Sequence, residues 1–207
     1  MGAMSIRPGQ DAWRQVAVIV AHPDDEILWC GGLILQNPDW DWTVLSLCRA
    51  GDADRRPKFD RVCELLQVQG AICDLDDSCP PGPVDVARDI VGRIRRHVCG
   101  EDWDLCITHG ANGEYGHERH RQVHAAVVRL VEAGELRCKE LWTFAYVCDA
   151  GTGRCAARRS ADVVVALTDG QLAEKKRIVH EMYGYGRDSF EVRACVGPEA
   201  FHRRATQ

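Results

Sequence analysis

Short apolar runs alternate along this chain with segments in which apolar residues recur every three or four positions. The runs are rich in β-branched residues and predict strands at 16–21, 42–48, 71–75, 105–108, 141–147 and 161–167. The segments with helical spacing predict helices at 26–36, 59–69, 84–98, 119–133 and 169–182. A strand followed by a helix, repeated four times, predicts an α/β fold with a doubly wound, mostly parallel sheet and helices on both faces.

The organisation of the chain predicts one domain. It has 207 residues, of which 45% are hydrophobic and 28% are charged, the balance of an ordinary globular protein. The run CPPGP at 79–83 predicts a loop and not a domain linker, since the alternation of strands and helices resumes directly after it. We therefore expect a single domain over residues 1–207, with its core at about 15–185.

Charge and apolar pattern argue against two classes of partner. The formal net charge is −5, and an acidic chain does not by itself attract nucleic acid or an anionic membrane. No apolar stretch approaches the ~20 residues that cross a bilayer, and no signal peptide is readable at the amino terminus. We expect neither a nucleic-acid partner nor a membrane span, and no pattern in the sequence indicates an oligomeric state.

The chain has eleven cysteines, an odd number and a large one for this length. No two of them form a C-x-x-C pair, so neither a zinc ribbon nor a thioredoxin-type motif is present. Several lie inside predicted strands, where cysteine acts as a small buried hydrophobe. Because a chain of this size needs no structural disulfide, the sequence favours a reducing, cytoplasmic location.

The first candidate site follows the first predicted strand. The run AHPDDE at 21–26 places one imidazole and three carboxylates within five positions. One aspartate could act only as a helix cap, and His22 could be an ordinary turn residue. Capping needs a single acidic residue, however, and consecutive carboxylates repel one another unless a cation or a shared proton neutralises them. An imidazole beside a carboxylate is a ligand pair that zinc accepts, so the run is a candidate metal site.

The second candidate site follows the fourth predicted strand, in the run THGANGEYGHERH at 108–120. His117 and His120 are three positions apart and therefore lie on the same side of a first helical turn. The alternative is an ordinary polar start of a helix, and His124, one turn further on, is expected to pack on the helix face. The run is not the H-E-x-x-H of zinc proteases, because Arg121 stands where the second histidine is required.

The two runs are expected to meet, because parallel strands bring their carboxyl ends to the same edge of a sheet. Two ligands from the first run and one histidine from the second would leave a fourth position for water, as in catalytic zinc sites. The remaining carboxylate can accept a proton from that water, and the spare histidine can donate to the oxyanion or to the leaving amine. No G-x-G-x-x-G follows the first strand, which disfavours a dinucleotide site.

These motifs resemble those of the PIG-L/LmbE-like deacetylases. The resemblance rests on AHPDDE at 21–26, Gly31-Gly32 and GHxxH at 116–120, and the order of elements agrees over nearly the whole chain. It implies a Rossmann-like fold and a zinc-dependent hydrolase that removes the acetyl group from an N-acetylglucosamine-type amino sugar or sugar conjugate. The implied nucleophile is a metal-activated water, and the implied partner is a small-molecule amino-sugar substrate.

The resemblance also assigns roles to residues. His22, Asp25 and His120 match the zinc ligands, and Asp24 matches the general base that activates the water. Two nitrogens and one carboxylate suit Zn²⁺, and the same set also serves Fe²⁺. His117 matches the residue that stabilises the tetrahedral intermediate and protonates the amine.

The match is less close at other positions. Tyr115 falls where some members carry a mobile tyrosine that polarises the carbonyl. Many members have Pro-Asp between the two histidines, and that aspartate orients a histidine, whereas this chain has Glu-Arg at 118–119. The basic residue that faces the substrate in some members corresponds to Arg56 or Lys58.

Two other functions remain open on the sequence alone. The first keeps the site but makes the protein a metal-dependent deacylase of a non-sugar amide or natural product, since fold and metal do not define the pocket. The second is a non-catalytic metal- or sugar-binding relative. Mere binding needs neither Asp24 nor His117, and the presence of both favours an enzyme.

Overall fold

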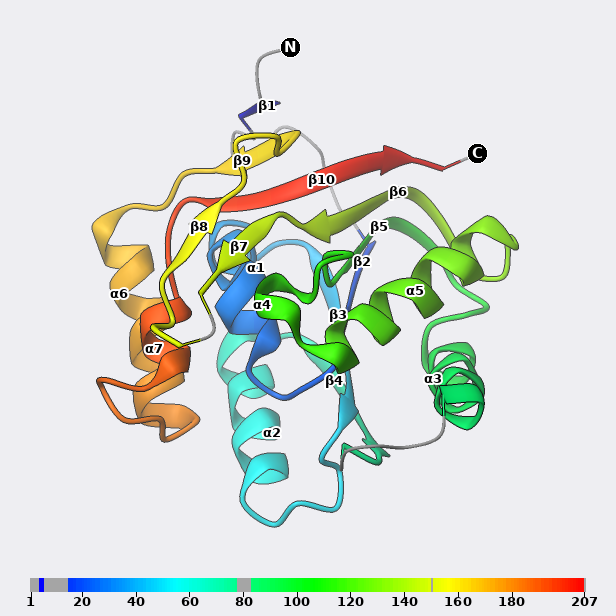
Figure 1. Cartoon of the computed structure of the whole chain (residues 1–207), viewed down its shortest axis with the longest axis horizontal. Helices are drawn as coiled ribbons and strands as arrows, with labels where there is room; N and C mark the ends of the chain where they lie inside the picture. Colours follow the sequence, from blue (N-terminus) through cyan, green and yellow to red (C-terminus); the bar gives the residue numbers. More distant parts are fainter. Residues whose placement is uncertain (1–3, 6–14, 78–82, 150, 207) are drawn as a thin grey trace.

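A large sheet forms the centre of the protein, whose computed structural model describes residues 4–5, 15–77, 83–149 and 151–206. Its eight strands are β1 (Met4–Ser5), β2 (Gln15–Val20), β3 (Asp41–Cys48), β4 (Gln69–Leu75), β5 (Asp102–Thr108), β6 (Arg137–Phe144), β9 (Val163–Val165) and β10 (Glu199–Ala205). They lie in the order β1-β9-β10-β6-β5-β2-β3-β4 (Figure 1). Neighbouring strands are parallel except at β10, which runs antiparallel to both β6 and β9. The predicted Rossmann-like, mostly parallel α/β fold is therefore confirmed.

Helices cover both faces of this sheet (Figure 1). They are α1 (Asp25–Gln36), α2 (Arg55–Leu66), α3 (Pro83–His97), α4 (Gly113–Gly116), α5 (Glu118–Glu132), α6 (Asp169–Arg177), the π-helix η1 (Ile178–Met182) and α7 (Phe190–Ala194). Successive residues of β2 point to opposite faces, as the pleat of a strand requires. Val16 and Val18 pack in the same core as α1, α2 and η1, whereas Ala17 and Ile19 pack with α3 and α5.

The carboxyl-terminal strand β10 was not predicted. Its sequence, EAFHRRA, has a short apolar stretch followed by three polar residues, so it lacks the alternation that marks a strand. The first three residues are buried and the last three are exposed, where Arg203 pairs with Glu140 and Arg204 with Glu132. The predicted helix at 59–69 also begins four residues earlier, at Arg55.

A small hairpin carries the one feature that departs from the expected cysteine chemistry. Strands β7 (Tyr146–Cys148) and β8 (Cys155–Ala157) form a separate two-stranded sheet, and a disulfide joins Cys148 to Cys155. The sequence did not predict this pair, because it indicated only that a chain of this size needs no structural disulfide. Eight other described cysteines are free thiols. Cys79 and the loop predicted at 79–83 lie outside the described residues, apart from Pro83, which begins α3.

A buried ion pair fixes helix α1, which begins at the first candidate motif. Glu199 accepts hydrogen bonds from Gly32 N and Leu33 N, both at 2.7 Å, and its Oε1 lies 2.6 Å from Lys175 Nζ. A Cβ atom at Gly32 would come within 3.0 Å of Glu199 Oε1 and 2.3 Å of a Leu167 methyl group. The glycine therefore allows the close approach to α1 of β10 and of Leu167, which lies between β9 and α6.

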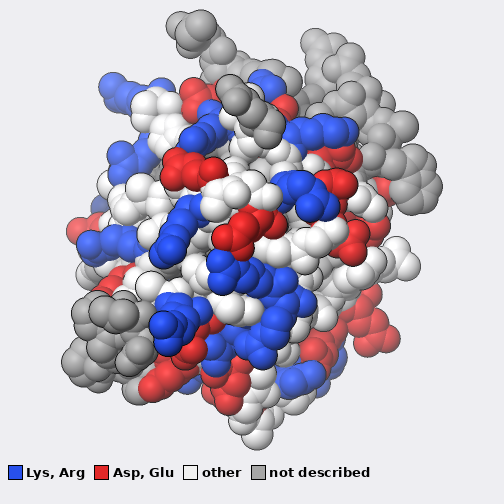
Figure 2. All heavy atoms as spheres, turned by 90° about the vertical axis from the view of Figure 1, so that its right-hand side faces the viewer, with Lys and Arg blue, Asp and Glu red and all other residues white. Residues whose placement is uncertain are grey.

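On the surface, basic and acidic side chains are interspersed over the face shown in Figure 2. Many of these neighbouring charges form exposed ion pairs, for example Arg95 with Glu135 and Arg137 with Asp102. Pairs of this kind contribute little to stability, because water and salt screen them. Within the ranges that the structure describes, no helix is both long enough and apolar enough to cross a membrane.

Candidate metal centre and active site

The candidate site lies at the carboxyl ends of β2 and β5, the neighbouring strands at which the order of the sheet reverses. The loop after β2 leads into α1, and the loop after β5 leads through α4 into α5. The first residues of the two loops are joined directly, because Ala21 N donates a hydrogen bond of 2.9 Å to His109 Nε2. The topology of the sheet thus brings the two predicted motifs to one place.

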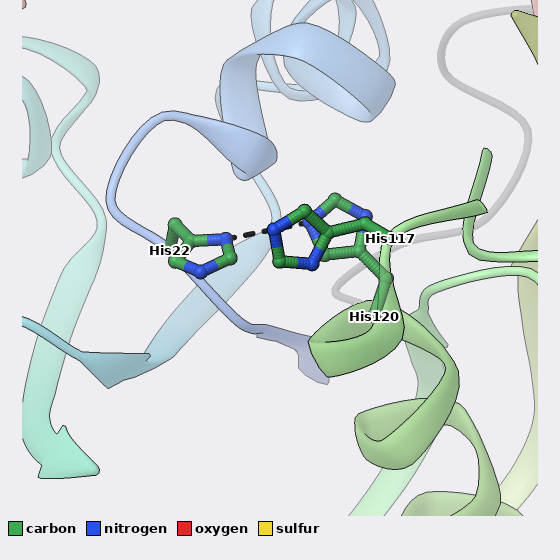
Figure 3. A group of neighbouring side chains, drawn as sticks. All are labelled: His22, His117 and His120. Atoms are coloured by element: carbon green, nitrogen blue, oxygen red, sulfur yellow. Dashed lines mark hydrogen bonds between the residues drawn. The ribbon is translucent and has the colours of Figure 1, made fainter. Parts of the chain in front are cut away.

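Three side-chain atoms from these loops converge on one point. His22 Nδ1 lies 3.3 Å from Asp25 Oδ2 and 3.3 Å from His120 Nε2, and Asp25 Oδ2 lies 3.4 Å from His120 Nε2. Figure 3 shows the His22 ring, from the loop after β2, facing the rings of His117 and His120 at the start of α5. The other oxygen of Asp25 accepts a hydrogen bond of 3.1 Å from Trp29 Nε1, which holds the carboxylate in this orientation.

A carboxylate orients the ring of His22 from its far side. His22 Nε2 lies 3.1 Å from Asp77 Oδ1, and Asp77 Oδ2 accepts a hydrogen bond of 2.8 Å from Arg49 Nη2. Burial by itself raises the pKa of Asp77, but the contacts with His22 and Arg49 outweigh it and lower that pKa to about 2. Asp77 is therefore ionised at neutral pH and holds the His22 ring with Nδ1 turned toward the other two donors.

A second carboxylate does the same for His120. The buried Glu114 places Oε2 2.6 Å from His120 Nδ1 and 2.9 Å from His109 Nδ1, while its Oε1 accepts from Gly110 N at 2.7 Å. Burial alone would raise the pKa of Glu114, but the two histidines lower it to about 2. Carboxylates that accept from the outer nitrogen of a histidine are typical partners of metal-ligating imidazoles.

The chemistry of this donor set fits a divalent cation. Two imidazole nitrogens and one carboxylate oxygen are ligands that zinc takes in catalytic sites. Burial lowers the pKa of His22, yet Asp25 and Asp77 raise it to about 10, so the point attracts positive charge. His109 also lies close, but its Nε2 already accepts the N–H of Ala21. His22, Asp25 and His120 could therefore hold a metal ion, and a ring nitrogen of His117 also lies within 4.8 Å of ring nitrogens of His22 and His120.

His117 lies beside this group and caps helix α5. Its Nδ1 accepts a hydrogen bond of 3.2 Å from Arg119 N, and its ring stacks on His120 with 4.4 Å between centroids. Because Nδ1 is an acceptor, the neutral ring carries its proton on Nε2 and can donate it in a hydrogen bond. Burial first, and then the nearby His120 and His22, lower the pKa of His117 to about 4. The ring is thus a neutral donor.

Asp24 precedes α1 in a backbone conformation that is rare outside glycine, with φ at 130°. The Tyr185 hydroxyl donates a hydrogen bond to Asp24 Oδ2, and Arg55 Nη1 lies 3.5 Å from the same oxygen. Burial, followed by the charge of Asp25, raises the pKa of Asp24 well above its usual value. A carboxylate with a raised pKa is suited to accept and return a proton near neutral pH.

The backbone of Asp24 is held by Glu26. Glu26 Oε2 accepts a hydrogen bond of 3.0 Å from Asp24 N, and Tyr183 OH lies 2.5 Å from Glu26 Oε1. Both side chains are buried, and burial raises the pKa of Glu26 to about 7. The third carboxylate of the motif therefore supports the strained turn and lies away from the group of metal-site candidates.

These residues face a pocket of about 400 Å³. Tyr115 forms part of its wall, with its ring 4.7 Å from Phe190 and 5.6 Å from His117 between centroids. Among the described residues no hydrogen bond involves the Tyr115 hydroxyl. The structure thus brings all six sequence candidates to this pocket or its floor: His22, Asp24, Asp25, Tyr115, His117 and His120.

Two basic residues line the pocket, Arg49 and Arg55, and neither is one of the two that the sequence suggested. Arg56 pairs with Asp60 on the surface of α2, and Lys58 pairs with Asp54. Sequence analysis also missed three residues that contact the candidates: Asp77, Glu114 and Tyr185. Only Glu114 gave a signal, because it lies inside the glycine-rich run that precedes His117.

Comparison with known proteins places this site in a family context. The family model for PIG-L, described as GlcNAc-PI de-N-acetylase, matches residues 17–131, which include both loops of the candidate site. An uncharacterised protein of Acanthamoeba polyphaga mimivirus is 23% identical over 143 residues, covering 62% of this chain. The match spans 60% of the length of that viral protein.

Two solved structures share the fold. GalB, the 4-carboxy-2-hydroxymuconate hydratase of Pseudomonas putida, has a TM-score of 0.63 at 14% identity, over 93% of this chain and 98% of its own. The pseudoaglycone deacetylase Dbv21 has a TM-score of 0.60 at 13% identity, over 95% of this chain and 97% of its own. One is described as a hydratase and the other as a deacetylase. The shared fold therefore does not define the reaction, which depends on the residues of the site.

Proposed function

This chain belongs to the PIG-L family, and from that membership we propose that it is a zinc-dependent N-deacetylase acting on an N-acetylglucosamine-type amino sugar or sugar conjugate. The observation that carries the proposal is the convergence of His22 Nδ1, Asp25 Oδ2 and His120 Nε2, which lie 3.3–3.4 Å from one another. Asp24 and His117 line the same pocket, and a protein that only bound metal would need neither.

The proposed metal ligands are His22, Asp25 and His120. When bound, the divalent cation supplies Lewis-acid polarisation of the acetyl carbonyl and lowers the pKa of water. The outer contacts of the ligands, with Asp77, Trp29 and Glu114, fix the three donor atoms before an ion arrives. A preformed site of this kind loses little conformational entropy when it binds.

Asp24 is the proposed general base. It accepts the proton of the attacking water and returns it to the nitrogen of the leaving amine, which its raised pKa favours. His117 donates the hydrogen bond of Nε2–H to the acetyl oxygen as negative charge develops there. The resemblance implied that His117 also protonates the amine. The bond from Arg119 N to Nδ1 supports a neutral ring, so we assign that proton to Asp24.

The test combines elemental analysis with a release assay. Freshly purified protein is analysed for metals, and acetate release is measured with the methyl glycoside of N-acetylglucosamine and with simple N-acetyl amines. We expect about one zinc ion per chain and turnover of the sugar. Asp24→Ala should keep the metal and lose turnover by about 10²- to 10⁴-fold, whereas His22→Ala should lose the metal.

Each other outcome of this assay points to a different function. Full turnover by rigorously metal-free protein would overturn the mechanism. Turnover of simple amides alone would make the protein a metal-dependent deacylase of non-sugar substrates. Saturable binding of the sugar with no release of acetate would make it a non-catalytic relative.

A further inference from the structure

The mouth of the pocket carries more carboxylates than cations. Outside the three donor residues and Asp24, its charged lining residues are the carboxylates Asp52, Asp77 and Glu191 and the guanidinium groups Arg49 and Arg55. The two positive charges of a divalent cation held by His22, Asp25 and His120 would be balanced by the carboxylates of Asp24 and Asp25. An incoming substrate therefore meets a mouth with a surplus of negative charge.

Both guanidinium groups are already engaged. Arg49 Nη2 lies 2.8 Å from Asp77 Oδ2, and Arg49 Nη1 lies 3.7 Å from Asp52 Oδ2. Arg55 Nη1 lies 2.5 Å from Tyr185 OH and 3.5 Å from Asp24 Oδ2. The Arg55 guanidinium also sits 4.5 Å over the centre of the Tyr185 ring. A phosphate group that approached either arginine would compete with these carboxylates for the charge of the guanidinium group.

Glu191 has no such partner. Among the described residues no ion pair involves its carboxylate, and it lines the pocket next to Phe190. Burial raises the pKa of Tyr115 and of Tyr185, and the charge of Glu191, which lines the same pocket, adds to both shifts. The aromatic wall of the pocket therefore carries an uncompensated negative charge.

From this arrangement we propose that the pocket takes a neutral or positively charged N-acetyl substrate and rejects one that bears a phosphate close to the acetylated amine. The inference rests on the proposed function and specifies the charge of its substrate. Hydroxyl groups can donate to the carboxylates of Asp52, Asp77 or Glu191, whereas a fully ionised phosphate has no proton to donate and only adds negative charge. Like charges placed side by side at a recognition surface exclude the wrong partner.

The test compares two substrates that differ only in charge. Acetate release by the zinc-loaded enzyme is measured with the methyl glycoside of N-acetylglucosamine and with the 6-phosphate of the same glycoside. We expect kcat/KM to be at least about tenfold lower for the phosphate, with a smaller gap in 0.5 M NaCl because salt screens the repulsion. Equal or higher kcat/KM for the phosphate would overturn the inference and leave the proposed function standing.

Charge variants test the source of the discrimination. Glu191→Gln and Asp52→Asn should each raise the ratio of kcat/KM for the phosphate to that for the neutral glycoside by a few-fold. Glu101→Gln removes an exposed carboxylate before β5, at the opposite edge of the sheet, and should leave the ratio unchanged. An unchanged ratio in both pocket variants would overturn the assignment.

Failure of the proposed function has a different signature. If neither glycoside releases acetate, the enzyme proposal fails, and the charge inference is tested by calorimetric titration of the metal-loaded protein. The probes are methyl glucosaminide, which carries an amine, and its 6-phosphate. Tighter binding of the unphosphorylated amine supports the inference, whereas equal or tighter binding of the phosphate overturns it.

Discussion

Glu114 Oε2 lies 2.6 Å from His120 Nδ1, and both side chains are fully buried at the end of β5. The resemblance of the motifs implied an aspartate between the two histidines, where this chain has Glu118 and Arg119. The structure shows that a glutamate earlier in the loop makes the orienting contact. Its backbone has φ at 55°, a left-handed conformation that turns the side chain back toward the rings of His109 and His120.

The first prediction concerns this contact. Glu114→Gln keeps the size of the side chain but removes the charge that holds Nδ1–H of His120, so zinc affinity should fall by about 10- to 100-fold. Competition with a chromogenic chelator measures the affinity. Glu118→Gln is the matched control, because Glu118 is exposed and its carboxylate accepts a hydrogen bond from Gln122 on the surface of α5. Equal zinc affinity in the two variants would contradict the role given to Glu114.

The second prediction concerns the hydroxyl of Tyr185, which donates to Asp24 Oδ2. With that oxygen engaged, Oδ1 is the one free to act as a base. Tyr185→Phe removes a hydrogen bond worth about 1 kcal/mol, so we expect kcat to fall by roughly fivefold with a smaller change in KM. Steady-state acetate release gives both constants.

A buried hydroxyl elsewhere controls for loss of stability in this variant. Tyr146 OH donates to Trp29 O and accepts from Ala200 N, outside the pocket. Tyr146→Phe should lower the melting temperature and leave kcat close to the wild-type value. A Tyr185→Phe enzyme with wild-type kcat would show that Tyr185 does not position Asp24.

Much of the candidate site was readable from the sequence because its residues are close together in two short runs. His22 and Asp25 are three positions apart and follow β2. His117 and His120 follow β5, which pairs with β2 in the sheet. The alternation of strands and helices predicted that these strand ends would meet. Parallel topology alone therefore brought together donors that are 98 residues apart in the chain.

The contacts that the sequence did not predict are those set by packing over long distances. Tyr185 is 161 residues from Asp24, and Asp77 is 55 residues from His22. No periodicity links such pairs, because each depends on how η1 or β4 packs against the sheet. Strand β10 was missed for a similar reason, since its pairing with β6 and β9 stabilises a segment with little strand character of its own.

The third prediction concerns the buried ion pair beneath the site. Lys175 Nζ contacts Glu199 Oε1 at 2.6 Å and lies 3.3 Å from both Leu28 O and Val196 O, so its three protons are all engaged. Lys175→Met leaves Glu199 charged and unpaired, which should lower the free energy of unfolding by about 3–5 kcal/mol. Urea denaturation measures the change.

Two further variants separate charge from packing at this pair. Lys175→Met combined with Glu199→Gln should recover part of the loss, because the buried charge is then absent. Lys176→Met alters the exposed neighbouring lysine and should stay within about 0.5 kcal/mol of the wild type. A double variant no more stable than Lys175→Met alone would argue that packing, and not the unpaired charge, dominates.

The last prediction is a pH dependence that originates at Glu26. Burial raises its pKa to about 7 in the folded protein, from an ordinary value of 4.5. The folded state therefore binds the proton more tightly, and the stability that this gives is complete below pH 4.5 and is lost as the pH rises through 7. Glu26→Gln cannot ionise, so its stability relative to the wild type should rise by roughly 3 kcal/mol between pH 4.5 and pH 8. Urea denaturation of both proteins in EDTA across this range gives the difference, and a difference that stays constant with pH would show that the pKa of Glu26 is the same in the folded and unfolded states.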